Sequence, residues 1–199
     1  MSDKKTKKYL SEQKNLAAEL TEDIVEEEVL EVIKAIEDSA KKGGMIFTVG
    51  NGGSSSTAKH LAADLDKTVD QEIDLNVNSY SLVSNESLLT AWTNDEGWKE
   101  VYKGQLEGKI SEEDVLIAIS VHGGSGPWSG NLVKALDHAN KKGATTVGIS
   151  GFDGGKFKET CDIPVVVKVD STPLVESLHV LLHHMIVFGL EEKRENESC

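Results

Sequence analysis

Short runs of β-branched and aliphatic residues alternate with longer stretches of helical periodicity along the chain from residue 45 onward. The short runs predict strands over residues 45–49, 74–78, 115–120, 145–150 and 163–169. The longer stretches predict helices over residues 56–66, 86–106, 129–142, 155–160 and 173–191. Strand–helix alternation is typical of a parallel sheet covered by helices on both faces. We therefore predict an α/β fold with three layers, in which two layers of helices enclose a doubly wound parallel sheet of five strands.

The first 43 residues contain no predicted strand and no proline. Apolar residues recur there at near-helical spacing, at Leu10, Leu16, Leu20, Val25, Val29 and Ile33. The pair Gly43-Gly44 is a stop signal for a helix. We expect residues 1–43 to form a helical arm, as two helices or one long bent helix, that packs on another subunit. The alternative is that the arm covers one face of the sheet. Residues 44–192 then form one ligand-binding domain, and residues 193–199 a disordered tail.

Charge and composition narrow the class of protein. The formal net charge of −13 argues against a nucleic-acid binder, which normally has a basic face. The two cysteines, Cys161 and Cys199, are too few for a disulfide framework. No apolar stretch reaches the roughly 18 residues that a membrane span needs, and the lysine-rich N-terminus lacks the apolar segment of a signal peptide. We expect a cytoplasmic protein that binds neither nucleic acid nor membrane.

Two loops rich in glycine and serine follow predicted strands. The first is Gly50-Asn-Gly-Gly-Ser-Ser-Ser and the second Ser120-Val-His-Gly-Gly-Ser-Gly. Ligands of open α/β sheets bind outside the carboxyl ends of the strands, where consecutive backbone N–H groups and a helix dipole attract anions. Neither loop is a Walker A motif or a dinucleotide fingerprint. Serine, asparagine and the absence of aromatic residues suit a phosphate with a polyhydroxylated tail.

Histidines and carboxylates gather on two predicted helices. His60 and Asp64 are four residues apart and share one helix face. Near the C-terminus, an otherwise apolar helix carries Glu176, His179, His183 and His184. Such a set can be an acid–base pair or a metal site, and the spacing does not decide between them.

Several motifs together resemble the sugar-isomerase (SIS) domain proteins, specifically the phosphoheptose isomerases. The resemblance covers residues 10–192 and rests on the segments GNGGSSSTAKHLAADL, TNDEGWKEVY, GFDGGKFKETCDIPVVV and STPLVESLHVLLHHMI. It implies a flavodoxin-like SIS fold. It also implies a homotetramer whose N-terminal helices form a central bundle and whose active sites are shared between subunits.

The resemblance also implies roles for residues of the two loops. Ser54, Ser120 and Ser125 would bind the phosphate. Asn51, Gly52 and Gly53 would shape the first loop. Asp95 would contact sugar hydroxyls.

Catalytic and metal-binding positions of the family fall on the two helices. The family's base, a glutamate, falls on Asp64, and its partner histidine falls on His184. The zinc ligands of some members fall on His60, Asp64, Glu176 and His184.

The chain departs from the family pattern at four places. Asp64 replaces glutamate, Glu176 replaces glutamine, His122 replaces a serine, and residues 127–130 form an insertion. A base displaced by roughly 1 Å can lose about a hundredfold in rate. These changes are compatible with an altered substrate, an altered metal dependence or lost activity.

We interpret the changed carboxylates as a better site for Zn²⁺ or another divalent cation, which would polarise a carbonyl and relax the demand on the base. Asp64 or Glu176 is then the base and His184 the acid. His122 either bonds the phosphate when protonated or is an exposed loop residue. His179 and His183 are interpreted as structural.

The expected reaction converts sedoheptulose 7-phosphate to D-glycero-D-manno-heptose 7-phosphate through an enediol(ate). One alternative is a non-catalytic adaptor of the same fold, of the type that associates with the bacterial replication initiator. The other is an isomerase of a different ketose phosphate.

Overall fold

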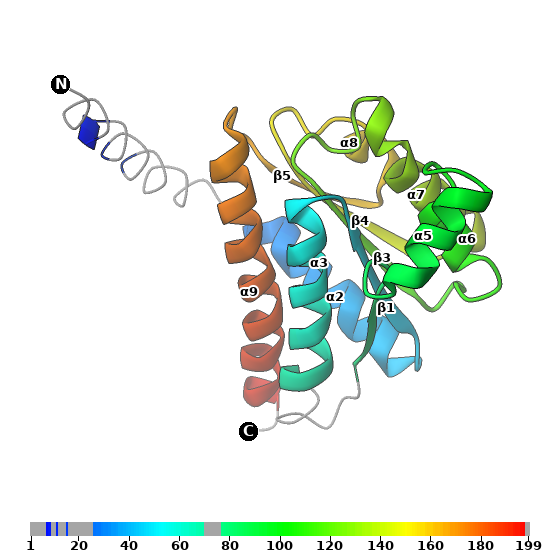
Figure 1. Ribbon diagram of the computed structural model, residues 1–199. Helices are drawn as coiled ribbons and strands as arrows, with labels where there is room; N and C mark the ends of the chain where they lie inside the picture. Colours follow the sequence, from blue (N-terminus) through cyan, green and yellow to red (C-terminus); the bar gives the residue numbers. More distant parts are fainter. Residues whose placement is uncertain (1–6, 9–10, 12–14, 16–25, 70–76, 198–199) are drawn as a thin grey trace.

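The sheet of this computed structural model, which describes residues 7–8, 11, 15, 26–69 and 77–197, contains five parallel strands (Figure 1). Their bounds are β1 Met45–Gly50, β2 Asn78–Ser81, β3 Val115–Ser120, β4 Thr145–Gly151 and β5 Ile163–Val167. The spatial order is β2-β1-β3-β4-β5, the flavodoxin-like order. The predicted five-stranded parallel sheet is confirmed.

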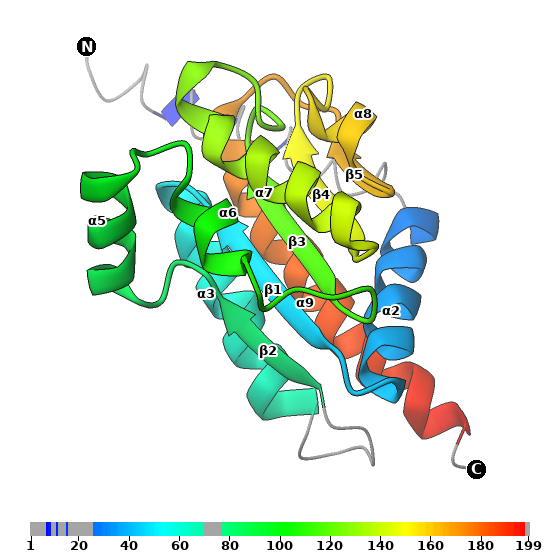
Figure 2. The same ribbon diagram turned by 90° about the vertical axis from the view of Figure 1, so that its right-hand side faces the viewer.

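Helices cover both faces of the sheet (Figures 1 and 2). One face carries α2 (Glu26–Lys41), α3 (Gly53–Asp64) and α9 (Thr172–Glu197). The other face carries α6 (Val101–Leu106), α7 (Gly130–Lys142) and the short α8 (Phe157–Thr160), with α5 (Glu86–Asp95) beside them. The three-layer prediction is therefore confirmed.

Strands β1 and β3 supply buried residues to both layers of the core. Along β3, Val115, Ile117 and Ile119 pack into the cluster under α2, α3 and α9. Leu116 and Ala118, which alternate with them, pack into the cluster under α6 and α7. Burial on both faces explains why the strand is a continuous apolar run rather than an alternating one.

The helical bounds differ from the predicted ones where glycine and local backbone conformation intervene. The expected helix over 86–106 is two helices, α5 and α6, separated by a turn in which Gly97 has a φ of 90°. Helix α3 begins three residues earlier than predicted and continues as a π-helical turn over Leu65–Val69. Strand β2 begins at Asn78, the last residue of the predicted 74–78 strand, and continues to Ser81. Residues 74–76 lie outside the described residues.

The described part of the arm packs within its own subunit. In α2, Val29, Val32, Ile33 and Ile36 are buried in the same cluster as residues of α9. Helix α2 ends as the glycine pair predicts, since Gly43 has a φ of 75° and the Gly44 N–H donates to the Ser39 oxygen. Leu10, Leu16, Leu20 and Val25 lie outside the described residues. The apolar face of α2 (residues 26–41) therefore packs on the sheet and α9 of the same subunit, which is the alternative predicted from the sequence.

Helix α9 is longer than predicted and extends to Glu197, into the segment expected to be a tail. Between Thr172 and Glu192 it is long and apolar enough to cross a membrane, contrary to the expectation from the sequence. Half of that window is buried inside the protein, where α9 packs against α2 and α3. Core helices of soluble proteins have the same length and composition, so this is weak support for a membrane span.

Candidate active site

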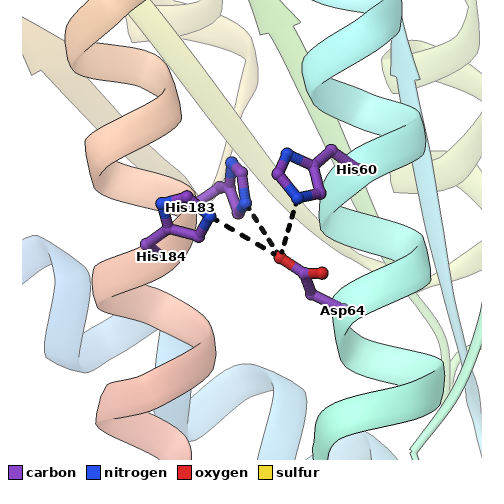
Figure 3. Close-up of polar contacts among 4 residues, drawn as sticks. All are labelled: His60, Asp64, His183 and His184. Atoms are coloured by element: carbon purple, nitrogen blue, oxygen red, sulfur yellow. Dashed lines mark hydrogen bonds and ion pairs between the residues drawn. The ribbon is translucent and has the colours of Figure 1, made fainter.

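Helices α3 and α9 lie side by side and bring four polar side chains together (Figures 1 and 3). His60 and Asp64 project from α3 because residues four apart share a helix face. His183 and His184 project from α9 towards them. One ligand atom from each of the four lies within 4.8 Å of the other three. We call these four residues the His–Asp group.

Three imidazole nitrogens surround one carboxylate oxygen of the His–Asp group. The distance from Asp64 Oδ2 is 3.1 Å to His183 Nε2, 3.4 Å to His60 Nε2 and 3.8 Å to His184 Nε2. In a tetrahedral zinc site with Zn–N distances of about 2.0–2.1 Å, neighbouring ligand atoms are about 3.3 Å apart. The donor types and their separations therefore fit a divalent metal ion such as zinc.

The His–Asp group is open to solvent on one side only. The side chains of His60 and His184 are 50% and 40% exposed, whereas that of His183 is 0% exposed. Burial lowers the pKa of His183 to about 4, and the hydrogen bond with Asp64 opposes this shift only in part. His183 is therefore neutral at physiological pH. A ligand can reach the group from the side of His60 and His184.

Glu176 is not a member of the His–Asp group, contrary to the predicted set of metal ligands. It precedes His184 by eight residues, which is about 12 Å along a helix. Its carboxylate lies instead beside the first turn of α3, where a Cβ added to Gly53 would be 2.6 Å from Glu176 Oε1. His183, which we interpreted as structural from the sequence, is the fourth member of the group. The sequence signal for His183 was its position next to His184, but only the packing of α9 on α3 shows where it points.

The two glycine- and serine-rich loops follow neighbouring strands. Strands β1 and β3 pair directly, and the chain runs from β1 outward to β2 on one side and β3 on the other. A reversal of strand order of this kind is where open α/β sheets bind ligands. Both loops therefore lie at the edge of the sheet where a phosphate site is expected.

The first loop leads into α3 with its amides available. Gly52 has a φ of 55° and precedes a helix start that no side chain caps. Ser54 is buried in the first turn. Uncapped N–H groups at a helix start attract anions.

The second loop is tightly folded. Gly123 and Gly124 have positive φ values of 54° and 75°, and the Gly124 N–H donates to Ser120 Oγ at 3.3 Å. A Cβ added to Gly155 would lie 2.6 Å from Ser125 Oγ, so a bulkier residue there would displace the serine. His122 is exposed, and its ring lies 4.4 Å from that of Phe152. Both rings line an open pocket of about 670 Å³ with Ser125 and Trp128.

Asn51 is held by residues that sequence reasoning missed. Its amide exchanges two hydrogen bonds of 3.0 Å with the amide of Asn131, and it accepts a third at 3.1 Å from the Tyr102 hydroxyl. The Gly50 oxygen lies 3.0 Å from the same hydroxyl, whose single proton is shared between the two acceptors. These bonds hold the first loop against the start of α7. No local pattern marks Tyr102 or Asn131, because their partners are about 50 and 80 residues away.

Asp95 lies apart from both loops in the chain. It ends α5, which has no buried residue in this subunit, and its exposed carboxylate accepts a hydrogen bond of 2.7 Å from Asn94. Figure 2 shows α5 at the edge of the molecule, beside α6. A role for Asp95 in sugar binding therefore stays a prediction.

The sequence matches the family model of the SIS domain over residues 8–151. A phosphoheptose isomerase of Aliarcobacter butzleri is 35% identical over 180 residues, which are 90% of this chain and 92% of the relative. A lincomycin biosynthesis protein of Streptomyces lincolnensis, LmbN, is 43% identical over 155 residues, which are 75% of this chain but only 56% of that protein.

Solved structures share the fold. Phosphoheptose isomerase GmhA of Neisseria gonorrhoeae superposes with a TM-score of 0.83 and 25% identity, covering 96% of this chain and all of that one. The phosphoheptose isomerase of Francisella tularensis has a TM-score of 0.85 at 21% identity, covering 96% and 99%. By its SIS-domain match and its full-length similarity to these enzymes, the chain belongs to the phosphoheptose isomerase family of SIS-domain proteins.

Proposed function

We propose that this protein isomerises a ketose phosphate to an aldose phosphate, with sedoheptulose 7-phosphate as the substrate and D-glycero-D-manno-heptose 7-phosphate as the product. The observation that carries the proposal is that two members of the His–Asp group, His60 and Asp64, lie on the helix, α3, that begins at the first glycine- and serine-rich loop. His60 follows Gly53 by seven residues, which is about 10 Å along the helix. That separation suits a long phosphosugar held at one end and reacting at the other.

The loops anchor the phosphate. Ser54, Ser120 and Ser125 offer hydroxyl donors, and the uncapped start of α3 offers backbone N–H groups. Binding energy from this remote end positions the carbonyl end of the sugar for reaction. The acidic surface of the chain is tolerated because the helix dipole makes the site locally positive.

Asp64 and His184 supply the proton transfers. The Asp64 carboxylate removes a proton from C1, the electron pair forms the C1–C2 double bond, and the carbonyl oxygen on C2 takes a proton from His184, which with Nε2 bound to a metal can give only the proton on Nδ1. Return of a proton to C2 and loss of the O1 hydroxyl proton give the aldose. Glu176 is the less suited base, because about 12 Å of helix separate it from His184.

A Zn²⁺ ion fits the His–Asp group, from which its ligands would be drawn. Bound there, it would polarise the carbonyl and stabilise the charge that develops on its oxygen. Asp64 then has both a ligating and a proton-accepting oxygen available.

A homotetramer with active sites at subunit interfaces is part of the proposal, as is a cytoplasmic location. Val180, Leu181 and Phe188 form an exposed apolar stripe along α9 at positions that share a face, and His184 lies among them. The His184 and Phe188 rings are 6.0 Å apart. A neighbouring subunit on this stripe would cover the open side of the His–Asp group. It would also give α5, which has no fully buried residue in its own subunit, a further surface to pack on.

The test is turnover of sedoheptulose 7-phosphate, followed as aldose formation, after chelation and after return of zinc. Turnover that zinc restores supports the isomerase and its metal together. Full activity in the chelated enzyme would remove the metal from the proposal. No turnover in either condition, with the oligomer intact, would overturn the heptose substrate and leave a different ketose phosphate or the adaptor.

A different ketose phosphate is the second candidate. It is favoured by the 43% identity to a protein named for lincomycin biosynthesis and by His122 and the inserted segment 127–130 beside the phosphate loop. Parallel assays with ketose phosphates of five to eight carbons would separate the two candidates.

A further inference from the structure

His183 is the buried member of the His–Asp group, and its two ring nitrogens have different surroundings. Nε2 lies 3.1 Å from Asp64 Oδ2. Nδ1 is buried and has no hydrogen-bond partner within the described part of the chain. The ring is packed between those of His60 and His184, at centroid distances of 4.4 and 3.9 Å. It therefore has little freedom to turn over and exchange the two nitrogens.

These surroundings select one tautomer. A neutral imidazole has one N–H donor and one lone-pair acceptor. Burying an N–H without a partner is rare in proteins, whereas an unpartnered acceptor is better tolerated. The proton therefore belongs on Nε2, where it is donated to the carboxylate, and the lone pair belongs on Nδ1.

The same reasoning argues against His183 as a metal ligand. To bind an ion through Nε2, the ring would have to carry its proton on Nδ1, where no described residue accepts it. Ligating histidines normally donate that second N–H to a carboxylate, a carbonyl or water. His60 and His184 are half exposed, so water can satisfy their second nitrogens.

We infer that His183 is a positioning residue, which holds the Asp64 carboxylate by an Nε2–H hydrogen bond and leaves His60, Asp64 and His184 as the three metal ligands. The metal part rests on the proposed function; the hydrogen bond does not. Three protein ligands leave a fourth position for water or substrate, as in catalytic rather than structural zinc sites. The carboxylate oxygen has two lone pairs, one for the ion and one for His183.

The hydrogen bond from His183 restricts the orientation of the Asp64 carboxylate. Asp64 is itself partly exposed, so its carboxylate would otherwise be free to rotate. The buried His183 ring of α9 donates to the carboxylate and removes that freedom. Outer donors of this kind change metal affinity by about 10–100-fold when they are lost.

The first experiment reads the tautomer directly in the metal-free protein by ¹⁵N NMR of the histidine rings. We expect His183 to be protonated on Nε2 and not on Nδ1, with the N–H signal shifted or lost in Asp64→Ala. Protonation on Nδ1 would overturn the inference. This measurement needs neither zinc nor turnover, so it separates failure of the inference from failure of the proposed function.

The second experiment compares His183→Gln with His183→Leu. The glutamine amide can donate from a place close to Nε2 but is a poor zinc ligand, whereas leucine cannot donate. We expect His183→Leu to weaken zinc binding by about 10–100-fold in competition with a chromophoric chelator, and His183→Gln to recover most of it. His184→Gln, which removes a ligand, should weaken binding more than either.

His179→Leu is the matched control, because it changes a buried histidine one turn earlier on the same helix. It should leave zinc affinity unchanged. If His183→Gln binds zinc as weakly as His184→Gln, His183 is a ligand and the inference is wrong. The kinetic counterpart is a kcat that falls in His183→Leu and recovers in His183→Gln, with KM little changed in both.

Discussion

At the scale of single residues, the site depends on one carboxylate oxygen that three imidazoles share. Asp64 Oδ2 has His60, His183 and His184 nitrogens within 3.8 Å. We therefore expect a neutral residue in place of Asp64 to abolish either binding of the metal ion or the function of the base. The anion loops lie about two helical turns away and should not respond to such a replacement.

Replacing Asp64 by asparagine tests this separation. We expect kcat to fall by about 10²–10⁴-fold, the usual contribution of a general base. The inhibition constant of inorganic phosphate should stay unchanged, because the serine loops are intact. Steady-state kinetics with phosphate as a competitive inhibitor measure both. Ser54→Ala is the complementary variant, and weaker phosphate inhibition is its expected result; an unchanged constant there would contradict the assigned anchor.

His60, Asp64 and His184 could be proposed from the sequence because helical spacing and the family motifs both mark them. His183 could not, since adjacent histidines on a helix point in directions about 100° apart and only the packing of α9 on α3 decides which ones reach Asp64. Glu176 was predicted as a ligand from the family pattern and from its place on the histidine-bearing helix. Its carboxylate lies beside Gly53, and eight residues, about 12 Å of helix, separate it from His184, so its role as a ligand stays a prediction.

At the scale of elements, the start of α3 and the first turns of α9 are in close contact. Gly53 leaves just enough room for the Glu176 carboxylate. Gly53→Ala should therefore push the Glu176 carboxylate aside and lower the free energy of unfolding by no more than about 1 kcal/mol, because the end of a flexible side chain can move. Combined with Glu176→Ala, the same change should be nearly neutral, since residues in contact are not additive.

Gly130→Ala is the control for this cycle, because a Cβ there meets only ordinary contacts with the Lys99 side chain, at 3.6 Å. Chemical denaturation of the four proteins and the control gives the coupling free energy. Equal costs of Gly53→Ala in both backgrounds would show that the carboxylate is not what Gly53 accommodates.

Helix α9 also makes stability depend on pH through His179. Burial lowers the pKa of this residue to about 4, with a smaller opposing effect from the Ser150 backbone. The unfolded chain, with a pKa near 6.5, binds more protons than the folded one between these values. Stability is therefore complete above about pH 6.5 and is lost as pH falls towards 4, by on the order of 3 kcal/mol. His179→Leu should flatten this part of the unfolding profile; an unchanged slope would assign the loss to other groups.

Most elements followed from the sequence because both faces of the sheet are buried, so that the central strand β3 is a nearly continuous apolar run. The break at Gly97 and the early start of α3 at Gly53 were less visible. Both depend on glycine or loop backbone conformation rather than on apolar spacing. The end of the arm at Gly43 was predicted correctly because the stop signal is local.

At the scale of the whole molecule, one surface connects assembly to catalysis. The apolar stripe of Val180, Leu181 and Phe188 flanks His184 on the exposed side of α9. We expect Leu181→Glu and Phe188→Glu to reduce the proposed tetramer to smaller species in sedimentation velocity, because a buried unpaired charge opposes association. The specific activity should fall in parallel.

Lys141→Glu, on an exposed position of α7, is the surface-charge control and should leave the mass unchanged. Dissociated subunits that keep full turnover would show that the active sites are not shared. The number of subunits could not come from the sequence without the family resemblance, since an apolar stripe indicates that something covers it but not how many copies assemble.

The reciprocal amide pair of Asn51 and Asn131 constrains how this protein can evolve. Each amide satisfies the other in a buried place, so changing one alone strands a polar group at a cost of about 1–3 kcal/mol. A lineage that alters the first loop must therefore alter the start of α7 in the same step or through a destabilised intermediate. The two positions, 80 residues apart, are expected to change together or not at all. Changes of substrate range should therefore occur at other residues of the loops.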